Sequence, residues 1–139
     1  MWEAVADSNM RAFESSMAWV EENDFSLQDL NAHNYGHLVQ FANYGYLQAG
    51  NLNQAAKIRE RVRSDYIASG LAAEIETPLA DVYARWILDL ERWQDAELLA
   101  ELASEYSIRS PGLWQPIGIA DRQSKRLNSS HVATSYAVV

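Results

Sequence analysis

Hydrophobic residues recur at intervals of three or four along most of this chain, which is the spacing of one face of an α-helix. The first stretch with this spacing predicts a helix from Trp2 to Val20, with charged residues on its opposite side. The predicted apolar face of this helix consists of Trp2, Val5, Asn9, Ala12, Phe13, Ser16, Met17 and Val20.

The most clearly marked part of the chain is residues 36–58, which predict two antiparallel helices joined by a tight turn. The first helix is expected to begin near Ser26 and Asp29, whose spacing resembles a capping box, although an interruption at 31–36 stays open. The facing surfaces are Leu38, Phe41, Ala42, Gly45, Tyr46 and Ala49 on the first helix, and Leu52, Ala55, Ile58, Val62 and Tyr66 on the second.

Three glycines mark special positions in and after this hairpin. Gly50 supplies the left-handed conformation that ends a helix at little cost, and Gly70, with Ser69, is predicted to end the second helix. Gly45 lies in mid-helix, where glycine costs about 1 kcal/mol relative to alanine. We therefore expect a neighbouring helix to approach closely at Gly45.

A third hairpin is predicted after residue 77. Thr77 and Pro78 form a helix-start signal, because threonine caps a helix and proline suits its first turn. The two helices are expected to bury Leu79, Val82, Tyr83, Trp86, Ile87 and Leu90, and then Trp93, Ala96, Leu99, Ala100, Ala103 and Tyr106. Ser110, Pro111 and Gly112 are predicted to end the hairpin, and another element is expected to begin over 113–120.

Composition supports a helical fold and excludes several kinds of function. The chain has 139 residues with a formal net charge of −8, which disfavours binding to nucleic acid and to anionic membranes. It has no cysteine, which excludes disulfides and thiolate chemistry. No apolar run approaches the length of a membrane span and no signal peptide begins the chain.

Residues 121–139 resemble the translated read-through of a sequencing-library adapter, as found in metagenomic fragments. The matching residues are Asp121, Arg122, Ser124, Arg126, Leu127, Asn128, Ser129, Ser130 and His131, followed by Ser135, Tyr136, Ala137 and Val138. We therefore expect one domain over 1–120 and a non-native tail over 121–139 that is disordered or fortuitously structured. A natural polar tail is the alternative.

The central hairpin resembles a tetratricopeptide repeat. Tyr46, Gly50 and Ala55 match the tyrosine of the first helix, the turn glycine and the small alanine of the second helix. Val39 departs from the usual tryptophan. The resemblance implies an all-α fold in which antiparallel helical hairpins stack as a fragment of an α-solenoid, with a scaffold or binding role and no catalytic residue.

A narrower resemblance is to bacterial tetratricopeptide-repeat proteins of unassigned activity. Their repeats carry a string similar to H-x-x-D-Y-L-x-Y-A-Y-L-Q, which His37, Tyr44, Tyr46, Leu47 and Gln48 match. Residues 1–4 resemble the start of a second helix in those proteins. We therefore expect truncation at both ends, with possible self-association through the exposed ends. A cytoplasmic location is favoured, and a periplasmic one stays open if truncation removed a signal peptide.

Five residues are candidates for a peptide-binding groove. First helices of repeat arrays commonly line the concave surface, and polar and aromatic residues there suit peptide recognition. Arg59 is expected to recognise a carboxylate of a partner peptide. The candidates are Tyr35, Asn43, Tyr44, Gln48 and Arg59. Ordinary packing of Tyr35 and Tyr44 against the preceding hairpin is the alternative.

His33 and His37 are weak candidates for a metal site, because residues four apart lie on one helical face. No third ligand has matching spacing, so a structural role for His37 is favoured. The sequence thus predicts a protein- or peptide-binding scaffold that is not an enzyme and uses no cofactor. The alternatives are a helical domain of a metal-assisted enzyme using this histidine pair, or a purely structural part of a longer repeat array.

Overall fold

The computed structural model is all-α. It describes the backbone of residues 1–27, 32–108 and 111–135, and the side chains of these ranges except at 32, 33, 124 and 126–135. No strand occurs in these ranges. The helices are α1 (Trp2–Glu22), α2 (Ala32–Gln48), α3 (Leu52–Ala68), α4 (Ala73–Asp89), the short 3-10 helix η2 (Trp93–Asp95), α5 (Ala96–Glu105) and α6 (Pro111–Ser135).

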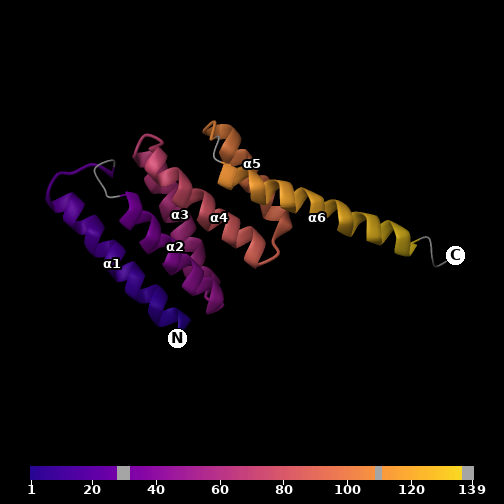
Figure 1. The fold of residues 1–139 in the computed structure, drawn as a ribbon, viewed down its shortest axis with the longest axis horizontal. Helices are drawn as coiled ribbons and strands as arrows, with labels where there is room; N and C mark the ends of the chain where they lie inside the picture. The colour runs from indigo at the N-terminus through magenta and orange to yellow at the C-terminus, as the bar shows by residue number, and fades with distance from the viewer. Residues whose placement is uncertain (28–31, 109–110, 136–139) are drawn as a thin grey trace.

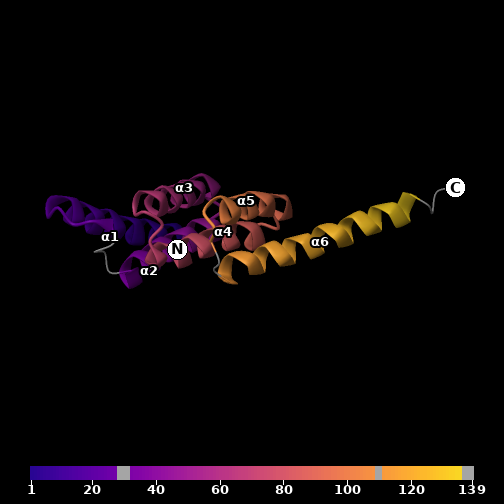
Figure 2. The same ribbon diagram turned by 90° about the horizontal axis from the view of Figure 1, so that it is seen from above.

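Consecutive helices from α1 to α4 run antiparallel to one another (Figure 1). The helices α2, α4 and α6 pack side by side, because α4 contacts α2 on one side and α6 on the other. Figure 2 shows α3 and α5 on one face of this layer. The C-terminal part of α6 extends beyond the other helices in both views.

The central hairpin has the turn that the sequence predicts. Gly50 has a φ of 73°, and its N–H donates to the Leu47 carbonyl at 3.0 Å. The N–H of Asn51 donates to the Tyr46 carbonyl at 2.9 Å, which completes a Schellman motif. The Asn51 side chain then caps α3 by accepting from the Gln54 N–H. The predicted end of α3 is also confirmed, because its last residue precedes Ser69.

The predicted close approach at Gly45 is confirmed. A Cβ added there would lie 2.9 Å from the Cβ of Ala6 and 3.0 Å from the carbonyl oxygen of Trp2. Real Cβ atoms do not occupy such short distances, so α1 can cross α2 here only because residue 45 has no side chain. The glycine at mid-helix is thus explained by packing.

The core lies between the helical layers, and most predicted positions in α3, α4 and α5 are buried. Trp86 is 6% exposed, which confirms its predicted core position. The prediction for α1 is partly wrong, because its fully buried residues are Ala6, Phe13 and Val20. Trp2 and Val5 of the predicted face are about two-fifths exposed, at 41% and 42%, whereas Ala6, which the spacing does not include, is 0% exposed.

The predicted start of α4 at Thr77 is wrong. The helix begins at Ala73, so that Pro78 is its sixth residue. Proline there has no N–H to bond the preceding turn, which disfavours the arrangement locally. Tertiary packing outweighs this cost, because Ile75 is 2% exposed and a Cβ on Gly36 would lie 3.3 Å from the Pro78 ring.

The predicted break near residues 110–112 is also wrong in part. The helix α5 ends earlier, at Glu105, and Pro111 begins α6, where its fixed φ suits the first helical position. The helix α6 continues across residue 121 to Ser135 without interruption. The origin of residues 121–139 stays a prediction.

The first helix of the central hairpin, predicted to begin near Ser26 and Asp29, is α2, which begins at Ala32. Asp29 lies outside the described residues.

Candidate functional site

A groove runs between α2 and α4. Its deeper part is a cavity of about 330 Å³, and a second hollow of about 340 Å³ adjoins it. The deeper part is lined by Gln40, Phe41, Asn43, Tyr44, Asp81, Val82 and Arg85. The second hollow is lined by Gly36, His37, Gln40, Ala73, Glu74, Thr77 and Pro78. Gln40 belongs to both, so we treat them together as the α2–α4 groove.

The groove follows the two helix axes. Its first half joins the N-terminal parts of α2 and α4, and its second half joins parts further along both helices. The two helices therefore run parallel. From residue 36 to residue 44 the helix rises about 12 Å, the length of three or four residues of extended peptide. The groove thus has the dimensions of a site for a short extended segment.

Asn43 lies at the bottom of the groove and is 1% exposed. Neither its Oδ1 nor its Nδ2 has a hydrogen-bond partner among the residues that the structure describes. A buried polar group without a partner costs about 1–3 kcal/mol, so such groups are rare in cores and call for an explanation. Because both atoms are buried, a ligand in the groove reaches them only when the side chains that cover them move aside.

The walls of the groove are aromatic on the α2 side. Phe41 is 54% exposed, and its ring stacks on the His37 ring at 5.5 Å between centroids. The Tyr44 and Trp2 rings meet in a T-shaped contact, also at 5.5 Å between centroids, and the Arg85 guanidinium lies 5.3 Å from the centre of the Tyr44 ring. A ligand in the groove therefore meets aromatic surface on this side.

The α4 side of the groove carries charge. The Asp81 carboxylate accepts a hydrogen bond from the Gln40 amide. Burial raises the pKa of Asp81 above its usual value, while Arg85 and the Gln40 hydrogen bond oppose this shift. Arg85 also lies 3.4 Å from Asp89, so its charge is already partly balanced.

The structure brings two of the five predicted groove residues together. Asn43 and Tyr44 both line the α2–α4 groove. Gln48 is exposed at the end of α2 and is not part of the lining.

Tyr35 is 3% exposed, and its ring packs on Phe13 of α1 at 5.3 Å between centroids, which corresponds to the packing alternative. Its hydroxyl donates to Asp65 of α3 at 2.9 Å. Arg59 lies outside the groove.

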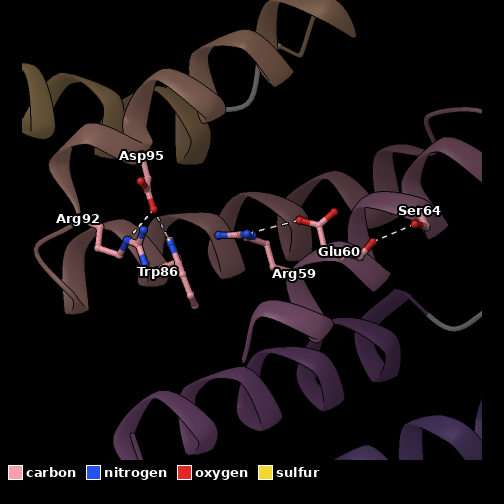
Figure 3. A network of polar contacts seen from close by, with 6 residues as sticks. All are labelled: Arg59, Glu60, Ser64, Trp86, Arg92 and Asp95. Atoms are coloured by element: carbon pink, nitrogen blue, oxygen red, sulfur yellow. Dashed lines mark hydrogen bonds and ion pairs between the residues drawn. The ribbon is translucent and has the colours of Figure 1, made fainter. Parts of the chain in front are cut away.

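Arg59 belongs to a stacked cluster on the side of α4 that faces α3 and η2. Its guanidinium lies 4.5 Å from the Trp86 ring and 5.4 Å from the Tyr83 ring, and its side chain is 16% exposed. Arg92 lies over the same Trp86 ring at 5.1 Å. Figure 3 shows Trp86 and Arg92 both directed at Asp95, with contacts of 2.8 Å and 2.7 Å.

This arrangement limits what Arg59 can do. Its outer nitrogen contacts Glu60 at 3.4 Å, and aromatic rings cover the guanidinium. Arg59 and Arg63 line a separate hollow of about 210 Å³ together with Glu60, Glu101 and Glu105. The three carboxylates outnumber the two guanidiniums, which disfavours an anionic ligand there, so recognition of a partner carboxylate by Arg59 stays a prediction.

The weak metal candidates have different outcomes. The side chain of His33 lies outside the described residues. His37 stacks on Phe41 at the open end of the groove. Among the described side chains, no group of three or more histidines and carboxylates lies close enough to hold a metal ion.

Within the described ranges, no helix is both long and apolar enough to span a membrane.

Sequence reasoning missed the α4 half of the groove. The spacing of Asp81, Arg85 and Asp89 indicates a solvated row of ion pairs, which fits the exposure of all three residues but does not show that Asp81 and Arg85 also line a groove. No signal within α4 distinguishes a solvent-facing carboxylate from one beside a groove.

In comparisons with known proteins, no family model, no curated protein and no solved structure matches this chain.

Proposed function

We propose that this chain is a protein-binding scaffold whose α2–α4 groove holds a short extended segment of a partner. The observation that carries the proposal is Asn43, whose buried amide has no partner among the described residues. In an extended peptide the N–H and the carbonyl of one residue point to the same side, so one residue of the partner satisfies both polar atoms of the side chain.

The arrangement of the helices supports the same function. Because α2, α4 and α6 pack side by side, the hairpins follow one another in one direction, as in an α-solenoid of tetratricopeptide type. In such arrays the first helices of the hairpins form a shared surface, and the α2–α4 groove lies between two of them. This role needs no catalytic group.

A displayed library of random linear heptapeptides tests the proposal. The immobilised chain is panned against the library, and each enriched peptide is synthesised and measured for binding to the chain and to Asn43→Leu by fluorescence polarisation. We expect peptides whose affinity falls at least tenfold in Asn43→Leu, because the variant removes two hydrogen bonds to the ligand. Gln48→Leu, on the same helix but outside the groove, is the matched control and should bind normally.

Two results would contradict the proposal. One is that no peptide is enriched above the background of an unrelated helical protein. The other is that all enriched peptides bind Asn43→Leu as well as the unmodified chain. Circular dichroism spectra of both variants check that the helices are intact, so a loss of binding reports on the groove and not on unfolding.

A further inference from the structure

We propose that the segment held by the α2–α4 groove is cationic, with a lysine or arginine side chain that pairs with Asp81. This inference rests on the proposed function, because it names the chemistry of the ligand at the same site. It reverses the charge that the sequence suggests, where Arg59 is expected to recognise a carboxylate.

The first support is the set of charges in the groove. The lining contains the carboxylates of Asp81 and Glu74 and one permanent cation, Arg85. Arg85 is already engaged, since it lies 3.4 Å from Asp89 and over the Tyr44 ring. Asp81 accepts a hydrogen bond from a neutral amide and, among the described residues, has no ion pair within 4 Å, so Arg85 balances its charge only from a longer distance. A ligand cation therefore finds a better partner here than a ligand anion does.

The second support is the position of Asp81 relative to Asn43. Both residues line the same cavity, Asn43 on α2 and Asp81 on α4. When one residue of an extended partner binds the Asn43 amide, the alternating side chains project across the groove, so that one of them can reach the α4 wall that carries Asp81. Asn43 is 1% exposed and unpartnered among the described residues, so it indicates a ligand independently of the acidic residues.

The third support is the aromatic wall. Long basic side chains lay their aliphatic stems on apolar surface while the charge reaches a polar partner. Phe41 is 54% exposed along the groove and provides such a surface. The Tyr44 ring already holds the Arg85 guanidinium at 5.3 Å, which demonstrates that this wall accommodates a cation. The chain's net charge of −8 further attracts basic segments.

The experiment uses the heptapeptides whose binding depends on Asn43. Their composition is compared with the unselected library, and the affinities of the best binders are measured for Asp81→Asn and for Glu97→Gln. Glu97 is an exposed carboxylate on α5 that is not part of the groove lining. Glu97→Gln is therefore the matched control for a general loss of negative charge.

We expect enrichment of lysine and arginine over aspartate and glutamate among these peptides. Binding of the basic peptides should weaken about fivefold to tenfold in Asp81→Asn, since a partly exposed charge pair contributes modestly, and less than twofold in Glu97→Gln. The Asp81→Lys variant should prefer peptides in which the basic residue is replaced by glutamate. Affinity should also fall as salt is raised.

The outcomes separate the inference from the function. If Asn43-dependent peptides are found but are neutral or acidic, or bind Asp81→Asn as tightly as the unmodified chain, the inference is overturned and the groove function stands. If no Asn43-dependent peptide is found, the proposed function itself fails and the inference fails with it.

Discussion

The two sides of α4 handle their polar groups differently. On the side toward α3 and η2, the Trp86 indole N–H donates to Asp95, and two guanidiniums cover its ring. On the side toward α2, Asn43 is more deeply buried than Trp86, yet neither of its polar atoms has a partner among the described residues. Arg59 Nε and Arg92 Nε on the Trp86 side also have no hydrogen-bond partner among the described residues, but their guanidiniums stack on the Trp86 ring and Arg92 pairs with Asp95. The Asn43 amide has no such contact within the described ranges, so the groove side leaves hydrogen-bonding capacity for a ligand.

The largest expected effect comes from removing the centre of the Trp86 cluster. Trp86→Ala should lower the free energy of unfolding by about 3–5 kcal/mol, because it empties a buried volume between α3, α4 and η2. Urea denaturation measures this change. Trp19→Ala is the matched control, since Trp19 is 57% exposed, and should cost less than about 1 kcal/mol. Equal effects of the two substitutions would mean that the register of α4 is wrong.

Removing a polar group from the cluster around Asp65 should destabilise the fold, as on the Trp86 side of α4 and unlike in the groove. The Asp65 carboxylate accepts from the Tyr35 hydroxyl and from Arg61, each at 2.9 Å. Asp65→Ala should therefore cost about 2 kcal/mol, since it leaves the buried tyrosine hydroxyl without a partner. Asp89→Ala removes an exposed carboxylate of the same type and should cost about 0.5 kcal/mol or less. Equal shifts of the denaturation midpoint in Asp65→Ala and Asp89→Ala would show that the Asp65 cluster contributes nothing to stability beyond an exposed carboxylate.

Alkaline pH tests the contact that holds α2 against α1. Burial, together with a hydrogen bond to Asp7 at 2.6 Å, raises the pKa of Tyr46 to about 12. The unfolded chain ionises its tyrosines near pH 10, so stability is complete below pH 10 and is lost as the pH rises toward 12. Tyr46→Phe should show a shallower fall over this interval in pH-dependent urea denaturation. A parallel fall in both proteins would contradict the assignment.

The smallest expected effect concerns the turn after α4, which lies beside the Trp86 cluster. Glu91 follows α4 with a φ of 52°, a left-handed conformation that costs energy for any residue except glycine. It forms the turn that positions Arg92, whose N–H donates to Ile87 at 2.9 Å. Glu91→Gly should therefore raise the free energy of unfolding by about 0.5–1 kcal/mol. Destabilisation in thermal melts would show that the Glu91 side chain contributes a contact of its own.

The helices and the central hairpin could be predicted from the sequence because their signals are local. Gly50, Asn51 and the spacing of Leu79, Val82 and Trp86 carry that information within a few residues. Gly45 is a further success, because a mid-helix glycine has a local cost that only close packing explains. These features determine elements and their buried faces.

The remaining features depend on residues distant in the sequence. The start of α4 is extended by burial of Ile75 against the core, which the local Thr77 signal does not contain. The groove could be predicted only on its α2 side, through Asn43 and Tyr44, because nothing within α4 indicates which helix Asp81 faces. Arg59 lies on a helix beside Trp86, and that pairing is likewise a tertiary feature.

The stability of Asn43→Leu tests the central claim most directly. If the Asn43 amide is kept for a ligand, a leucine of similar size removes an unsatisfied buried polar group. The free energy of unfolding, measured by urea denaturation without peptide, should then stay equal or rise by about 1 kcal/mol, while binding of the selected peptides is lost. A fall of about 2 kcal/mol or more would show that Asn43 is a structural residue, and would contradict the account.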